Sequence, residues 1–174
     1  MLLALLPVSN TMAAKEQDFV AQMMEHISSS PDTYNASEYH NVTVSPTMIS
    51  MMIDMMDNEE SAKLLPNSNI PNQEVLRQLL KDVKSLRIFT VSNSADKYKE
   101  LMLQLLKKHK RTYKEYPAQD KLGDKKHIWT RQSNNNVVEI ILLDESSEDN
   151  KPLQILNLTG VFSDTFFDTL MQMR

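Results

Sequence analysis

Apolar side chains recur every three or four positions in several stretches of this chain, which is the spacing of a helix that buries one face. The spacing predicts helices over residues 19–27, 46–56, 74–84 and 98–106, and a last helix that begins after Ser163. Ser45 and Pro46 suit the N-cap and the first turn of the second helix. A large part of the chain is therefore expected to be helical.

Shorter stretches with alternating or β-branched apolar residues predict strands between and after these helices. They cover residues 41–45, 86–91, 112–118, 126–132, 137–143 and 153–162. The last four follow one another, with turns at 134–136 and at the acidic stretch 144–150, so we expect an antiparallel meander. Both alternating sets of side chains are apolar in 137–143, which is typical of a central strand covered on both faces.

Together these elements predict an α+β fold in a single domain over residues 15–174. We expect two layers, with a mixed or mostly antiparallel sheet and helices packed mainly on one face. The length of 174 residues fits one such domain with a core of its own. The polar stretch 57–72, which contains Pro66 and Pro71, is the longest predicted loop and a candidate cover for a site.

The first fourteen residues differ from the rest of the chain. Residues 1–7 are almost wholly apolar, and the stretch ends in the small residues Ala13 and Ala14, as in the apolar region and cleavage site of an export signal. No Lys or Arg precedes Lys15, so we interpret 1–14 as a truncated signal peptide. We therefore expect an exported protein, in the periplasm or at the cell surface. No later window offers the roughly 20 apolar residues of a transmembrane helix.

The composition excludes several function classes. The chain has no cysteine, which excludes a disulfide framework and thiolate chemistry. Its net charge of −4 and pI of about 5.6 argue against a nucleic-acid partner, which requires a concentrated positive field. With only two glycines there is no phosphate-binding glycine loop. We predict neither a cofactor nor a bound metal.

An ordered set of apolar segments resembles a known family. The segments are 42–45 leading into the Met-rich helix, then 83–89, 98–106, 137–143 and 156–160 followed by a last helix. Their order over about residues 16–173 is similar to domain of unknown function 4252. That resemblance implies a small exported protein of Bacteroidetes-type bacteria with a single domain. Because the family's function is not established, it supplies no functional residues.

Methionines dominate one face of the predicted helix 46–56: Met48, Met51, Met52, Met55 and Met56. Core packing is our first interpretation, because methionine is a common filler of cores. The same flexible thioethers could instead form an apolar binding face for ligands or partner helices, or bind Cu(I). No histidine lies inside this helix to support the metal alternative.

Two charged clusters are further candidates. The basic run 107–111 could dock an anionic headgroup, a glycan or an acidic peptide, although cations at a helix C-terminus also stabilise the helix dipole. The acidic turn with Asp144, Glu145, Glu148 and Asp149 could bind Ca²⁺, but its spacing matches no EF-hand. We interpret this turn as a hydrated loop.

No catalytic motif is present around His26, His40, His109 or His127. There is neither a Gly-x-Ser-x-Gly elbow nor a His-Glu-x-x-His helix, and we predict no catalytic residues. His127 and Trp129 lie on the same face of one predicted strand and are the best candidate for an exposed aromatic patch.

By elimination, we expect a non-catalytic envelope protein that binds another protein, a peptide or a glycan. An alternative is a carrier of small apolar ligands, with a pocket between the Met-rich helix 46–56 and the sheet and with 57–72 as its lid. A hydrolase assembled from distant histidine, serine and acidic residues ranks third.

Overall fold

The computed structural model describes residues 17–57, 73–117, 126–144 and 152–172. Its helices are α1 (Phe19–Ser28), α2 (Pro46–Asp57), α4 (Gln73–Asp82), α5 (Ala95–Lys108) and α7 (Asp164–Gln172), with a short 3₁₀ turn at Ala36–Glu38. Its strands are β1 (Tyr39–Val44), β2 (Val83–Val91), β3 (Tyr113–Glu115), β4 (Lys126–Ser133), β5 (Asn136–Asp144) and β6 (Leu153–Phe162). Every helix and strand predicted from the pattern is present, with shifts of a few residues at the ends.

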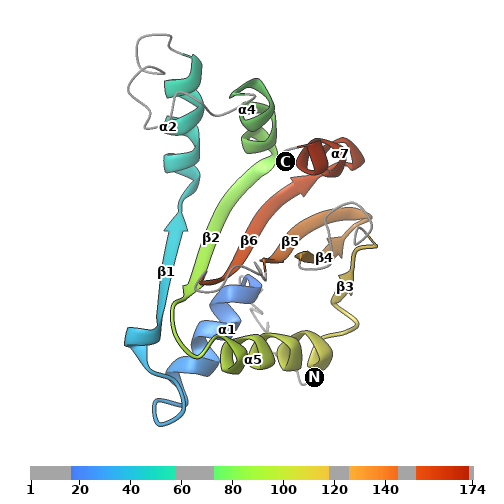
Figure 1. Ribbon diagram of the computed structural model, residues 1–174. Helices are drawn as coiled ribbons and strands as arrows, with labels where there is room; N and C mark the ends of the chain where they lie inside the picture. The colour runs from blue at the N-terminus through green and yellow to red at the C-terminus, as the bar shows by residue number, and fades with distance from the viewer. Residues whose placement is uncertain (1–16, 58–72, 118–125, 145–151, 173–174) are drawn as a thin grey trace, which may run out of the picture.

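The strands form one six-stranded antiparallel sheet in the order β1-β2-β6-β5-β4-β3 (Figure 1). This arrangement confirms the α+β class and the predicted meander of the last four strands. The turn between β4 and β5 contains Asn134 and Asn135 at φ of 50° and 66°, a left-handed conformation that asparagine tolerates well. Strand β2 joins this meander at β6, and β1 forms the outer edge beyond β2.

The sheet is apolar on both faces, and each face has a core of its own. In β5, Ile141 and Leu143 belong to one buried cluster, whereas Ile140 belongs to the other and Leu142 packs against it. Neighbouring side chains of a strand point to opposite faces, so the two clusters lie on opposite sides of the sheet. The covered central strand predicted from 137–143 is therefore β5.

Helices cover both faces of the sheet. Helices α1 and α5 supply the buried apolar side chains of the first cluster, and α2, α4 and α7 supply those of the second. Figure 1 shows α1 and α5 near one end of the sheet and the other three near the opposite end. The expectation that helices pack mainly on one face is therefore corrected. The physical reason is the two-sided apolar pattern of the central strands, which requires cover on both sides.

Several predicted features lie outside the described residues. These are the signal segment 1–14, nearly all of the loop 57–72, and Glu145, Glu148 and Asp149 of the acidic turn. Among the helices that the structure does describe, none combines the length and the apolar character needed to cross a bilayer.

Gly160 lies where β6 passes the end of α4. A Cβ atom at this position would overlap the backbone carbonyl oxygen of Asp82, and it would also lie 3.0 Å from the ring of Phe162. Backbone cannot move aside as a flexible side chain can, so the close approach of strand and helix requires the absence of a side chain here.

We predict that Gly160→Ala lowers the free energy of unfolding by about 1–3 kcal/mol, because the added methyl group overpacks this contact. Chemical denaturation at neutral pH measures the loss. Val161→Ala is the matched control, since Val161 is an exposed neighbour on the same strand and its substitution should change stability by less than about 0.5 kcal/mol. Equal stability of Gly160→Ala and the natural chain would contradict the close approach.

Candidate binding surfaces

A fully buried carboxylate, that of Glu139 on β5, lies between the sheet and the N-terminus of α1. It accepts hydrogen bonds from the backbone N–H of Phe19 at 2.6 Å and from Nε of Arg131 at 2.7 Å. Asn157 Nδ2 donates to it at 2.9 Å and the Tyr113 hydroxyl at 3.3 Å. A buried charge is tolerated only with such partners, so these contacts make Glu139 an anchor of the fold.

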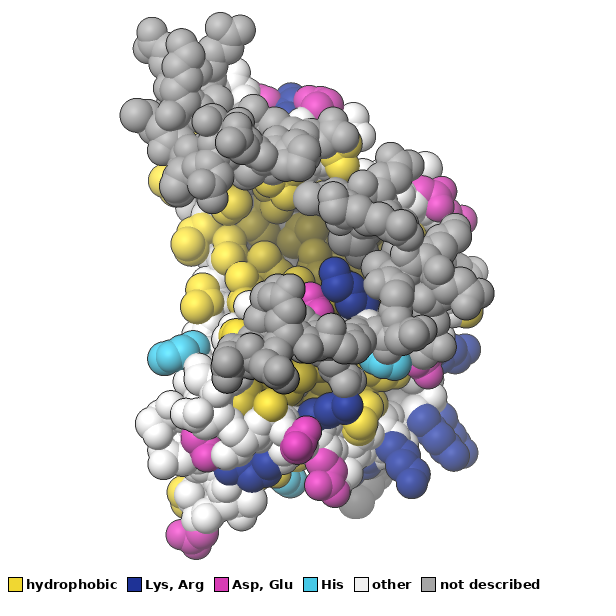
Figure 2. Space-filling view, viewed as in Figure 1, with side chains coloured by type: hydrophobic (Ala, Val, Ile, Leu, Met, Phe, Trp, Pro, Cys, Tyr) yellow, Lys and Arg dark blue, Asp and Glu magenta, His cyan; other side chains and the backbone are white. Residues whose placement is uncertain are grey.

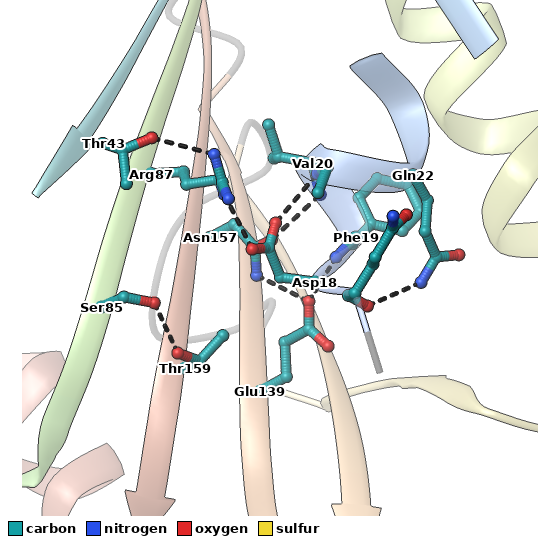
Figure 3. Close-up of polar contacts among 12 residues, drawn as sticks. Asp18, Phe19, Val20, Gln22, Thr43, Ser85, Arg87, Glu139, Asn157 and Thr159 are labelled. Atoms are coloured by element: carbon teal, nitrogen blue, oxygen red, sulfur yellow. Dashed lines mark hydrogen bonds and ion pairs between the residues drawn. The ribbon is translucent and has the colours of Figure 1, made fainter. Parts of the chain in front are cut away.

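The first turn of α1 is bound to the sheet by further polar contacts (Figure 3). Asn157 Oδ1 accepts the backbone N–H of Val20 at 3.0 Å. Asp18 caps the helix by accepting the N–H of Ala21 at 2.9 Å, and its other oxygen accepts from Nε of Arg87 at 2.7 Å. Carboxylates also interact favourably with the positive end of the helix dipole. Two acidic side chains therefore fix where α1 begins.

This polar network stabilises the fold, and its hydrogen-bond donors occupy both carboxylate oxygens of Glu139. Burial, and secondarily the negative charge of Glu139, raises the pKa of the Tyr113 hydroxyl above its ordinary value, so Tyr113 stays protonated and can donate. Sequence reasoning missed the network. One signal was available, because Glu139 interrupts a strand that is otherwise apolar, and an acid in a covered strand needs partners.

The Met-rich helix exposes most of its methionines. Exposed fractions are 48% for Met48, 58% for Met51, 37% for Met52 and 36% for Met55, whereas Met56 is half-buried against the second core cluster. The core interpretation is therefore wrong for these four residues. Ile49, Ile53 and Met56 form a separate stripe that faces the protein. Helix α2 thus has more apolar surface than its contact with the sheet covers.

The exposed methionines adjoin the free edge of the sheet. Strand β1 leads directly into α2 and, among the described strands, pairs only with β2; its Val42 is 52% exposed. Figure 2 shows apolar side chains gathered over β1 and β2 below α2. We define the Met surface as Val42, Met48, Met51, Met52 and Met55. Exposed apolar side chains that gather on one helix and the strand before it are typical of an interaction site.

A polar cavity of about 420 Å³ lies at the opposite edge of the sheet, around β3 and β4. The residues that line it are Arg111, Thr112, Lys114, Thr130, Arg131, Gln132 and Ser133. It therefore collects one member of the predicted basic run, Arg111, with two cations that the sequence did not single out. The side chains of this lining offer many hydrogen-bond donors and no large apolar group.

The predicted aromatic patch is only partly present. The rings of His127 and Trp129 do stack, with centroids 5.8 Å apart, as expected for one strand face. Trp129 is only 9% exposed and belongs to the first core cluster, so the expectation of an exposed patch is wrong for this residue. The reason is that α1 and α5 cover this face of β4. His127 Nδ1 lies 3.6 Å from Glu115.

The other predicted histidines do not assemble a reactive site with His127. His26 packs its ring against Tyr34 on the α1 side, His40 lies on the edge strand β1, and His109 follows the end of α5. Within the described part of the chain, no group of three His, Asp or Glu residues is placed to hold a metal ion. Asp144, the described member of the acidic turn, lies 3.8 Å from Lys126.

A cluster around Glu38 fastens α5 to the chain before β1. Glu38 accepts hydrogen bonds from Lys97 Nζ at 2.7 Å, the Tyr98 hydroxyl at 2.8 Å and the Ser94 hydroxyl at 2.9 Å. These bonds, that of Lys97 foremost, lower the pKa of Glu38 to about 2. Ser94 is the N-cap residue of α5, and its side chain bonds Glu38 and makes no capping hydrogen bond to the helix.

Comparison with known families finds a match that covers the sheet. A family model described as Domain of unknown function (DUF4252) matches residues 33–165, which contain the whole sheet. No curated protein and no solved structure matches. The match covers most of the chain, and its description names no activity and no ligand.

We predict that Glu139→Gln lowers the free energy of unfolding by about 3–5 kcal/mol, because it leaves the buried Arg131 guanidinium without its carboxylate. Urea denaturation measures the change. Glu100→Gln, at an exposed position on α5, is the control and should stay within about 0.5 kcal/mol of the natural chain. Small and equal effects of both substitutions would contradict the anchoring role.

We also predict an acid-dependent contribution from Glu38. Its pKa is lowered from 4.5 to about 2 in the folded protein, so its stabilising effect is complete above the unfolded pKa and is lost as the pH falls from about 4.5 towards 2. The stability difference between the natural chain and Glu38→Gln should therefore shrink over this interval. Urea denaturation at a series of pH values tests this, and a constant difference across the interval would refute it.

Proposed function

Since the chain belongs to the family of Domain of unknown function (DUF4252), which carries no assigned activity, we propose that it is a non-catalytic binding protein of the cell envelope. Its partner is another protein, which docks on the Met surface defined above. The periplasm or the cell surface is the proposed location, on the basis of the apolar first residues and the small residues that follow them.

The observation that carries this proposal is the exposure of four methionines on one stripe of α2. Fully burying a large apolar side chain is worth about 1.5–3 kcal/mol, so leaving four of them partly in water forgoes several kcal/mol of stability. A partner that covers them recovers this free energy. Methionine side chains adapt their shape to varied apolar surfaces, which suits a protein partner better than a hydroxyl-rich glycan.

The edge strand β1 supports the same proposal. Natural edge strands are commonly protected by charged residues or proline, as β3 is by Lys114 and Glu115 on the other edge. Strand β1 (Tyr-His-Asn-Val-Thr-Val) contains neither Lys, Arg, Asp, Glu nor Pro. No other described strand pairs with its outer backbone groups, so a strand of the partner can pair there and place its side chains against the methionines beside it.

The packing of α2 favours docking over the carriage of a small ligand. Ile49 is almost completely buried, and Ile53 and Met56 pack against the second core cluster, so the side of α2 that faces the protein is in contact with the protein itself. The methionines point away from that contact. A surface of this kind fits a macromolecular partner better than an enclosed apolar ligand.

Crosslinking in cells tests this function. With a photoreactive diazirine analogue of methionine incorporated throughout the chain, crosslinks to another protein should arise at Met48, Met51, Met52 and Met55. The completely buried Met23 and Met102 should give intramolecular crosslinks only. In the variant Met48→Gln/Met51→Gln/Met55→Gln, recovery of the same partner with a lysine-reactive reagent should fall at least tenfold, because the apolar contact is lost.

Leu103→Gln is the matched control, since Leu103 is an apolar side chain of similar exposure (40%) on α5, away from the Met surface. It should leave partner recovery unchanged. An equal loss in both variants, or no loss in either, would contradict docking through the Met surface. Recovery of the chain from the cytosolic fraction would contradict the proposed location without affecting the docking result.

A further inference from the structure

The cavity around β3 and β4 combines residues from three segments. Arg111 and Thr112 come from the turn after α5, Lys114 from β3, and residues 130–133 from β4. Lys114 pairs with Thr130 and Tyr113 with Arg131 across the two strands, so these lining residues lie on neighbouring rungs, with side chains that alternate between the two faces at this edge of the sheet. Its volume of about 420 Å³ is within the range of small-molecule sites, which is about 300–1,000 Å³.

The lining is strongly one-sided in charge. Arg111, Lys114 and Arg131 are basic, and no Asp or Glu is among the described residues that line the cavity. The other lining side chains are the hydroxyls of Thr112, Thr130 and Ser133 and the amide of Gln132. The whole chain carries a net charge of −4, so this cavity departs in sign from the rest of the molecule. Clustered cations around a concave surface focus a positive field.

One of these cations is held in place by the fold. Arg131 is nearly buried, with its side chain 10% exposed, and its Nε is bonded to the fully buried Glu139. This bond holds the guanidinium in the buried network under α1, where Glu139 offsets its charge, so the anion-binding charge of the cavity comes from the other two cations. Arg111 and Lys114 are exposed and form no ion pair with another residue in the described ranges, so the positive charge they add is not offset there.

Stabilisation of a helix end does not explain Arg111. The negative end of the α5 dipole is already adjoined by Lys107 and Lys108 in its last turn. Arg111 lies three positions beyond the end of α5 and lines the cavity. The basic run therefore has two parts: Lys107 and Lys108 belong to the helix end, and Arg111 lines the cavity.

We propose that this cavity binds a small hydrophilic molecule that carries a phosphate or sulfate group. Arg111 and Lys114 bind the anionic group, since charge-assisted hydrogen bonds to such oxygens are the strongest that side chains offer. The hydroxyls and the Gln132 amide bind the polar remainder of the ligand. The site is independent of the Met surface, which lies at the other edge of the sheet.

Titration of the full chain with defined probes tests the proposal. The probes are inorganic phosphate, inorganic sulfate, glucose 6-phosphate and uncharged glucose. Binding is measured by calorimetry and by the NMR shifts of the β3 and β4 amides. We expect saturable binding of at least one anion with one-to-one stoichiometry, weaker at high salt, and none of glucose. Comparison of phosphate with sulfate, and of free probes with phosphatidylglycerol vesicles, identifies the source of the anionic group.

Variants locate the binding. The variant Arg111→Gln/Lys114→Gln should bind the anion at least about tenfold more weakly, which corresponds to about 1.4 kcal/mol of binding free energy. The variant Lys107→Gln/Lys108→Gln removes the same number of positive charges outside the cavity, and its affinity for the anion should stay within about twofold of that of the natural chain. The methionine variant should bind the anion unchanged, so failure of either proposal is visible separately. Equal loss in both lysine-containing variants, or no saturable binding of any anion, would overturn the inference.

Discussion

The position of helix α1 depends on a negative charge that has no access to water. Glu139 lies in the middle of a central strand, where its carboxylate must obtain all of its hydrogen bonds from protein groups. Those groups come from the start of α1, from Arg131 on β4 and from Asn157 on β6. Any arrangement of these elements that separates them leaves a buried charge unpaired. The network therefore selects one position of α1 on the sheet among the many that apolar contacts alone would permit.

The two-sided sheet explains why one helix keeps an apolar surface that the rest of the protein does not cover. The second face is covered by α2, α4 and α7, of which α4 packs against α2, α7, β2 and β6. Helix α2 continues beyond the end of β1 at the edge of the sheet (Figure 1), and it packs against α4 and β2 alone among the element pairs in close contact in the described part of the chain. Ile49 and its stripe satisfy that limited contact, and the methionine stripe beside it remains in water. The exposed surface is thus a consequence of placing a broadly apolar helix at the margin of a sheet.

Periodicity predicted the elements, the class and the meander, because these depend on neighbouring residues. It did not predict the insertion of β2 beside β6 or the network at Glu139, whose contact with Phe19 joins residues 120 positions apart. The methionines show a different limit. Their spacing indicates correctly that they share a face, but only the tertiary structure decides whether that face is covered. Likewise, Lys114 is an ordinary strand residue until the fold places it with Arg111 at one cavity.

The pairing of β2 with β6 has a consequence for how the chain reaches this structure. Strands β4, β5 and β6 are joined through neighbours in sequence, so they can form from local contacts. Strand β2 must pair with β6, which is distant from it in the sequence, as the pair Leu86 and Leu158 illustrates. Such long-range closure is slow, since the entropy of a large loop is lost before the contacts are gained. Until β2 has paired with β6, both β2 and its described partner β1 leave unpaired edges open to other chains.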